Sequence, residues 1–290
     1  MAEHTRDIKR RIRSIKNTEQ ITKAMEMVAA ARLRRAQERV EAARPYSQKI
    51  DELIKRLAGT FSEITHPLFL SRKRHNVGYA VFTSDRGLCG AFNSHVIRRA
   101  EAEMAQEEEA TLIVIGRRGR DYFRRRDYNL VAEFLAIGDE PIVSQAHGIA
   151  RTLVELYEGN IVDEVNLVYT EFISTGRQQP VVFKLLPLTT PQIKEEDEMF
   201  EDTIPDYIIE PSPQGVLEML LPRFIEAEIF RALLEAKTSE HAARMIAMSN
   251  ATENAGEMID QLTLLSNKLR QAAITKEIAE IVGGADALKG

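Results

Sequence analysis

The sequence predicts a mixed α+β/α/β fold, in which the N- and C-terminal helices form an antiparallel two-helix coiled coil and a Rossmann-like α/β domain is inserted between them. Both ends of the 290-residue chain are long stretches with few helix breakers, and the middle alternates short apolar runs with helical patterns. We expect the N-terminal helix at 1–59, the α/β domain at 76–190, an acidic connecting loop at 191–211 and the C-terminal helix at 212–283.

The C-terminal helix is expected to run from Ser212 to Val282. Ser212 suits a helix N-cap and Pro213 suits the first turn, whereas Gly283-Gly284 is expected to end the helix. A single helix of about seventy residues would be roughly 105 Å long at 1.5 Å per residue. A helix of that length needs a second helix along it.

The partner helix is expected from Thr5 to Leu57, with a kink at Pro45. Positions spaced alternately by four and three residues form its seam, and eleven of the fifteen are apolar. These positions are Ile8, Ile12, Ile15, Glu19, Thr22, Glu26, Ala29, Leu33, Ala36, Val40, Ala43, Ser47, Ile50, Ile54 and Leu57. The same spacing in the C-terminal helix gives a weaker seam of Thr238, His241, Met245, Met248, Thr252, Ala255, Ile259, Leu262, Ser266 and Leu269. Together the two seams predict an antiparallel pair.

The C-terminal arm is the longer one, by about seventeen residues or roughly 25 Å. The excess contains apolar side chains with no expected partner in the chain: Ile274, Ile278, Ile281, Val282 and Leu288. An unpaired apolar helix tip in water promotes aggregation. We therefore expect another protein to shelter this tip.

The middle of the chain is expected to hold five strands and three helices. The strands are expected at Val77–Thr83, Thr111–Ile115, Leu130–Ile137, Val165–Ile173 and Val181–Leu188. The helices are expected at Ala91–Glu109, Gly116–Arg126 and Pro141–Glu158. Buried strands that alternate with helices predict a mainly parallel sheet with right-handed crossovers, and the last two strands suit a hairpin or a sheet edge.

Charge is distributed unevenly along the chain. Residues 1–58 carry fifteen Lys/Arg and eight Asp/Glu, or +7, whereas the remainder carries −12, for a net charge of −5. A basic rod predicts an anionic partner, which could be nucleic acid, lipid headgroups or an acidic protein surface. The chain has no run of eighteen apolar residues, so a membrane span is not expected. Its N-terminus has no apolar signal core, so export is not expected either.

The segment Thr83 to Gly90 has the most enzyme-like composition, because it follows the first expected strand. Asp85, Arg86 and Cys89 could act as an acid, an anion clamp and a nucleophile. Against this hypothesis, the chain lacks both the Gly-x-Gly-x-x-Gly and the Gly-Lys-Ser/Thr phosphate loops, and His95 stands where a phosphatase-style cysteine loop would need arginine. We favour a tight glycine turn around a small buried thiol.

Other candidate sites are weaker. Gly116-Arg-Arg-Gly119 opens a helix after a strand and could suit an anion, although we favour a plain turn. The single cysteine excludes an internal disulfide and a cysteine-based zinc site, and the six histidines have no metal-ligand spacing. We expect no catalytic, cofactor-binding or metal-binding residues. Two alternatives stay open on residues alone: a basic coiled-coil protein that binds nucleic acid, and a Cys89-dependent α/β enzyme.

The chain resembles the gamma subunit of the F-type ATP synthase over essentially its whole length. Four stretches carry the resemblance: IKNTEQITKAMEMVAA at 15–30, SDRGLCG at 84–90, SEHAARMIAM at 239–248 and RQAAITKEIAEIV at 270–282. The resemblance implies a non-catalytic central-stalk rotor, with a coiled coil standing inside a ring of alternating alpha and beta subunits. The epsilon subunit and the membrane c-ring are its other implied partners, and neither nucleic acid nor a direct membrane span is expected.

The resemblance also implies which residues belong to contact or coupling regions. These positions are Lys23, Met25, Arg86, Arg244, Arg270, Gln271 and Thr275. Arg86 and the basic helix are implied to face an acidic loop on beta. The dithiol insert of plastid relatives is missing here, so the chain looks bacterial and is expected at the cytoplasmic face of the cell membrane. The sequence leaves open whether the coupling ion is H⁺ or Na⁺ and whether synthesis or hydrolysis is favoured.

Overall fold

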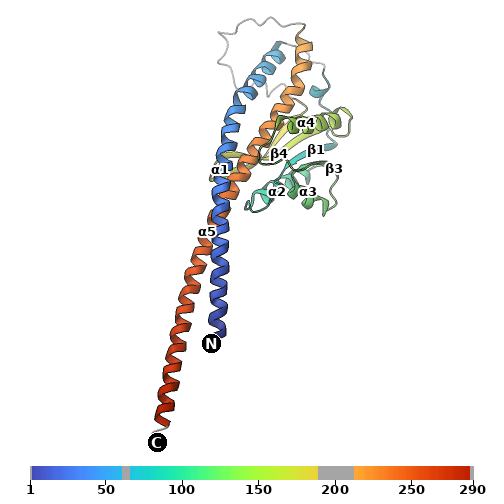
Figure 1. Ribbon diagram of the computed structural model, residues 1–290. Coiled ribbons are helices and arrows are strands. Elements are labelled where there is room, and N and C mark those ends of the chain that lie inside the picture. The colour runs from blue at the N-terminus through green and yellow to red at the C-terminus, as the bar shows by residue number, and fades with distance from the viewer. Residues whose placement is uncertain (1, 61–65, 189–211, 288–290) are drawn as a thin grey trace. The chain divides into compact units, whose positions relative to one another are not determined.

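The computed structural model divides the chain into two compact units. It describes residues 2–60, 66–188 and 212–287. The first unit is formed by the segments Met1–Ala29 and Arg244–Gly290, and the second by Ala30–Ala243. Helix α1 (Ala2–Thr60) and helix α5 (Pro213–Ala287) contribute a segment to each unit (Figure 1).

The first unit is a pair of antiparallel helix segments. Thr252 on α5 donates a hydrogen bond to the hydroxyl of Thr22 on α1, with the oxygens 2.8 Å apart. A Cβ added to Gly256 would lie 3.8 Å from the carboxylate of Glu19. Residue numbers therefore rise along α5 as they fall along α1, which confirms the antiparallel pairing that the two seams predict.

The seam positions in this unit are the residues that the pair buries. From Ile8 to Ala29, every predicted seam position is buried or half-buried, and apart from Met25 the residues between them are exposed. From Met245 to Leu269, every predicted seam position is likewise buried or half-buried. The alternating spacing of four and three residues thus located the contact face correctly.

Helix α5 continues past the start of α1. Ala2 lies twenty residues before Thr22, and Ala272 lies twenty residues after Thr252, so about fifteen residues of α5 extend beyond the pair, or roughly 22 Å. The expected tip side chains are exposed, namely Ile274, Ile278, Ile281 and Val282, while Leu288 lies outside the described residues.

The prediction that Gly283-Gly284 ends this helix is wrong, because α5 runs to Ala287. Glycine lowers helix propensity by about 1 kcal/mol per residue, but it stops a helix only where the chain turns into a left-handed conformation. The described residues contain no such turn after Val282. At the other end the N-cap prediction is confirmed, since the amide of Gly215 donates to the Ser212 hydroxyl at 3.1 Å.

The second unit contains a five-stranded sheet in the order β3-β2-β1-β4-β5. Its strands are β1 (Asn76–Phe82), β2 (Glu109–Ile115), β3 (Leu130–Phe134), β4 (Glu164–Ser174) and β5 (Arg177–Leu186). Its other helices are η1 (Pro67–Phe69), α2 (Phe92–Met104), α3 (Arg117–Arg124) and α4 (Val143–Glu158). The first four strands pair in parallel, and β4 and β5 form an antiparallel hairpin, which confirms the predicted mainly parallel sheet.

The sheet separates two hydrophobic cores. Along β1, Tyr79 and Val81 pack into the core shared with α2 and α3, whereas Ala80 and Phe82 pack into the core shared with α4 and the two long helices. Successive side chains of a strand point to opposite faces, so burial on both faces explains the uninterrupted apolar run of β1. Ile54 of α1 belongs to the second of these cores, so the seam of α1 faces the interior in this unit too.

Several predicted boundaries are wrong, among them the last strand, which is Arg177–Leu186 and not 181–188, and three of the differences have identifiable reasons. The helix expected to reach Glu109 ends at Met104, because Glu109 already belongs to β2 and its amide donates to the carbonyl of His75. The strand expected to reach Ile137 ends at Phe134, because the next amides donate to a side chain outside the sheet. Helix α4 begins at Val143 instead of Pro141, since the N-cap is Ile142.

Two further expectations concern the long helices and the connections. Helix α1 passes through Pro45 and is described to Thr60, one residue beyond Gly59. The acidic loop expected at 191–211 lies outside the described residues. The domain boundaries drawn from the sequence stay a prediction.

Candidate functional site

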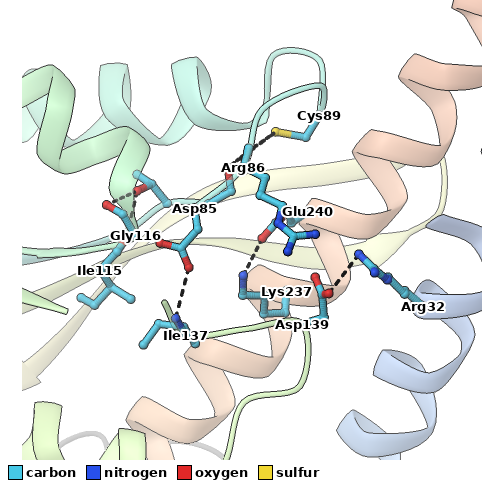
Figure 2. A network of polar contacts seen from close by, with 12 residues as sticks. Arg32, Asp85, Arg86, Cys89, Ile115, Gly116, Ile137, Asp139, Lys237 and Glu240 are labelled. Carbon is cyan, nitrogen blue, oxygen red and sulfur yellow. Dashed lines mark hydrogen bonds and ion pairs between the residues drawn. The ribbon is translucent and has the colours of Figure 1, made fainter. Parts of the chain in front are cut away.

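The carboxyl edge of the parallel sheet carries the motif at 84–90, and Asp85 connects three loops there. Its Oδ1 accepts hydrogen bonds from the amides of Arg117 at 3.1 Å and Ala136 at 3.2 Å. Its Oδ2 accepts from the amide of Ile137 at 3.1 Å (Figure 2). Because all of these partners are backbone donors, Asp85 joins the loops after β1, β2 and β3 and is not free to act as an acid.

The Gly116–Gly119 turn is closed by the chain itself. Gly116 has φ +97, and a Cβ there would lie 2.2 Å from the carbonyl oxygen of Thr83, so only glycine fits this close approach. At the start of α3, the amide of Arg118 donates to the Ser84 carbonyl at 3.0 Å and that of Gly119 donates to the Thr83 hydroxyl at 2.9 Å. With the Arg117 amide on Asp85, the helix N-terminus has its donors occupied and is not an anion site.

Cys89 is a buried part of the same turn, with 2% of its surface exposed. The Asn93 side-chain amide donates to its sulfur at 3.3 Å, and the Asn93 carbonyl accepts from the Ser84 amide at 2.9 Å. A nucleophilic cysteine needs access to substrate and a group that stabilises the thiolate. Cys89 is enclosed instead, which agrees with the tight turn favoured from the sequence and not with a Cys89-dependent enzyme.

Two residues of the motif point outward. Arg86 is exposed, and Leu88 is 62% exposed with a positive φ of 62. A left-handed backbone at a leucine costs on the order of 1–3 kcal/mol, which the buried polar contacts around it offset. In Figure 2 the Arg86 side chain is directed toward the part of α5 that carries Glu240.

That part of α5 contains an unusual number of buried polar side chains. Lys237 donates to Glu240 at 2.8 Å, although their side chains are only 8% and 4% exposed. The Ser239 hydroxyl donates to the Thr170 carbonyl on β4 at 3.1 Å. The buried ion pair costs desolvation and adds little net stability, and both of its members lie on α5, so the contact that joins this part of α5 to the sheet is the Ser239 hydrogen bond.

An arginine face on α1 is a second polar contact, which the sequence reasoning missed. Arg32 pairs with Asp139 at 2.9 Å, and Arg35 and Arg39 both pair with Glu140. The acidic residues lie in the loop between β3 and α4, next to the segment that Asp85 holds. The spacing of three and four residues between the arginines, together with the Gly-Asp-Glu sequence at 138–140, is the signal that could have revealed it.

The contact residues implied by the resemblance belong to both compact units. In the first unit Lys23 pairs with Glu26 at 3.2 Å and Met25 is half-buried. Arg270, Gln271 and Thr275 are exposed on α5, where the Thr275 hydroxyl donates to the Gln271 carbonyl at 2.9 Å.

The remaining two residues differ from this exposed group. Arg244 is only 7% exposed, so its guanidinium is engaged within the chain. Arg86 belongs to the second unit. Among the described residues, Arg270, Gln271 and Thr275 are neighbours on α5, and Lys23 and Met25 are neighbours on α1.

Neither a metal-binding cluster nor a membrane-spanning helix is present among the described residues. Within residues 2–60, 66–188 and 212–287, no three His, Cys, Asp or Glu side chains are grouped as a metal ion would require. None of the helices in that described part combines the length and the apolar character that a membrane crossing requires.

Comparison with known proteins gives matches over almost the whole chain. A family model described as ATP synthase matches residues 4–288. The chain is 53% identical to the ATP synthase gamma chain of Moorella thermoacetica over 287 residues, covering 99% of both chains. It is 50% identical to the ATP synthase gamma chain of Heliobacterium modesticaldum over 286 residues, covering 98% of both.

Solved structures with the same fold come from mitochondrial assemblies. A chain from the Euglena gracilis mitochondrial ATP synthase, OSCP/F1/c-ring, rotational state 3, matches with a TM-score of 0.70 and 20% identity, covering 99% of this chain and 95% of that one. A chain from the Tetrahymena thermophila mitochondrial ATP synthase central stalk/c-ring matches with a TM-score of 0.60 and 25% identity, covering 80% of this chain and 99% of that one.

Proposed function

The chain belongs to the ATP synthase gamma-chain family, and from this premise we propose that it is the central-stalk rotor of an F-type ATP synthase. The observation that carries the proposal is the 53% identity over 99% of both chains. In this role the chain breaks no bond itself. It transmits rotation between the membrane c-ring and the hexamer of alpha and beta subunits, where ATP is made or hydrolysed.

The paired helices are the shaft of this rotor. The apolar tip of α5, with Ile278 and Ile281 exposed, is sheltered by the surrounding hexamer. In the paired part of the first unit, α1 exposes a row of basic side chains: Arg6, Lys9, Arg10, Arg11, Arg13, Lys16 and Lys23. Exposed ion pairs contribute only about 0–1 kcal/mol each, so contacts between these residues and acidic partner loops can form and break as the shaft turns.

The residues implied by the family resemblance are proposed as partner contacts. Lys23, Met25, Arg270, Gln271 and Thr275 are available to the hexamer from the helix pair. Arg86 is available from the sheet unit, because it is exposed beside the buried Cys89 turn. Arg244 is proposed to act on partners indirectly, through the packing of α5, because its side chain is almost fully buried.

The location follows from the assembly. The family is part of a membrane-associated complex, and we propose that this chain lies on the cytoplasmic face of a bacterial cell membrane, held there by the c-ring and the epsilon subunit.

A reconstitution experiment tests the function. The full chain is mixed with alpha and beta subunits of a close relative, the complex is isolated by size exclusion, and ATP-driven rotation of a bead attached to the chain is recorded. We expect one chain per hexamer and rotation that stops when ATP is removed. ATP hydrolysis by the isolated chain, or failure to join the hexamer, would contradict the proposal.

A further inference from the structure

A cavity of about 500 Å³ lies between α1, α5 and the β4–β5 hairpin of the sheet unit. Its lining mixes apolar and charged side chains, and the charged ones come from three elements. Arg44 is on α1, Glu171 is on β4, and Glu228, Arg231 and Glu235 are on α5. The cavity could hold several water molecules, since each occupies roughly 30 Å³ in the liquid.

Two polar atoms that line this cavity are buried without a hydrogen-bond partner among the described residues. They are Oε2 of Glu235 and Nε of Arg231. The rest of the Arg231 guanidinium is held, because Nη2 lies 2.6 Å from Glu228 and the group stacks over the Phe183 ring at 5.4 Å. Both atoms are closed to solvent, so a charge on the unpartnered Glu235 carboxylate is poorly solvated and its protonated form is favoured.

The charges around Glu235 do not balance. Three carboxylates face two guanidinium groups, and Arg231 is already paired with Glu228. Arg231 therefore attracts both Glu228 and Glu235, and Arg44 adds a weaker attraction to Glu235. The Tyr169 hydroxyl on β4 adds no positive charge, and the residue that β5 contributes is the apolar Phe183. One additional positive charge would neutralise the cluster, and no metal-binding group is present in the described residues.

We propose that this cavity is a proton-binding site, in which Glu235 takes up one proton and thereby releases Arg44 of α1 from electrostatic attraction to α5. Burial is the largest factor that raises the pKa of Glu235, which reaches about 7 from an ordinary value of 4.5. Arg231 and Arg44 oppose the rise, whereas Glu171 and Glu228 add to it. The site would make the join between the two long helices sensitive to pH.

The pKa of Glu235 is higher in the folded chain than in the unfolded chain. The folded chain binds the Glu235 proton more tightly than the unfolded chain does. The resulting stabilisation is present below pH 4.5 and is lost as the pH rises toward about 7.

Carbon NMR of the full chain tests the site. The chain is labelled with ¹³C at the glutamate carboxyl, and the Glu235 signal is assigned by its loss in Glu235→Gln. We expect the Glu235 signal to titrate with a midpoint about 2 to 3 pH units above that of an ordinary glutamate. A midpoint near 4.5, or no titration between pH 4 and pH 9, would overturn the proposal.

Two neighbouring substitutions keep the test decisive if Glu235→Gln does not fold. Arg44→Gln removes an attraction and should raise the midpoint of the anomalous signal, whereas Glu171→Gln removes a repulsion and should lower it, each by roughly several tenths of a pH unit or more. Glu218→Gln, at an exposed position on the same helix, is the matched control and should leave the midpoint unchanged. Shifts of the same sign for Arg44→Gln and Glu171→Gln would also overturn the proposal.

Amide hydrogen exchange tests the effect on α1. In the parent chain, peptides that cover 40–48 should exchange at different rates at pH 6 and pH 8 after correction for intrinsic chemistry. Glu235→Gln carries no charge at either pH and should abolish the difference. If the difference persists in this variant, the release of Arg44 is wrong.

Discussion

The two compact units bury their side chains in different ways. In the sheet unit, Tyr79, Leu112 and Leu167 are completely enclosed between two layers of helices. In the helix pair, few side chains are buried, and two of the most buried are the small residues Ala29 and Ala255. A narrow seam of small side chains buries little apolar surface. The comparison indicates that the sheet unit can stabilise itself, whereas the helix pair depends on what surrounds it.

The largest effect on the free energy of unfolding is expected from truncating a core side chain of the sheet unit. A truncation on the seam of the helix pair should cost much less. Leu167→Ala should lower the free energy of unfolding by about 2–5 kcal/mol, because Leu167 is fully buried. Ile259→Ala should cost about 1 kcal/mol, because Ile259 is half-buried on the seam. Urea unfolding followed by far-ultraviolet circular dichroism and by hydrogen exchange measures both. Equal losses at the two positions would contradict the comparison.

The second effect concerns the polar contacts of the sheet edge. Asp85→Ala removes the acceptor for the amides of Arg117, Ala136 and Ile137, and should cost about 2–3 kcal/mol. Asp85→Asn is the matched control, because it keeps one acceptor oxygen and should cost about half as much. Hydrogen exchange at Ala136 and Ile137 is the direct measurement. Unchanged protection there in Asp85→Ala would show that the loops do not depend on this carboxylate.

Much of this contrast could be read from the sequence. The spacing of seam residues from Ile8 to Ala29 predicted the buried face of α1, because helix periodicity depends only on local geometry. The apolar run of β1 predicted a strand covered on both faces for the same reason. The exposed tip at Ile278 followed from helix length alone.

The rest depends on contacts between distant parts of the chain. That Asp85 would accept from Ala136 and Ile137, and so end β3 early, cannot be inferred from either stretch alone. The pairing of Arg39 with Glu140 and the cavity around Glu235 likewise join segments about a hundred or more residues apart. Local patterns predict elements, but which side chains meet across them is decided by how the elements pack.

A smaller effect is expected at the polar contact inside the helix pair. Thr252→Val removes the hydroxyl that meets Thr22 at 2.8 Å and should destabilise the pair by about 1 kcal/mol. Adding Thr22→Val should cost less than it does in the parent chain, because the Thr22 hydroxyl has then already lost its hydrogen bond with Thr252 and keeps only the one to the Glu19 carbonyl. Hydrogen exchange of the segment 245–260 reports the change. Strictly additive losses would mean that the two hydroxyls do not interact.

The smallest effect on the chain itself is expected at the tip. Ile278→Ser combined with Ile281→Ser should change the free energy of unfolding by less than about 0.5 kcal/mol, because both side chains are already exposed. In the complex, the same double substitution should have a large effect. If the tip is sheltered by the hexamer, each lost isoleucine removes about 1.5–3 kcal/mol of burial, and the affinity for alpha and beta subunits should fall at least tenfold. Glu277→Gln, at an exposed position in the same turn, should assemble normally. A double variant that joins the hexamer as tightly as the parent would mean that the tip is not enclosed. The helix pair would then be stabilised by contacts elsewhere along its length.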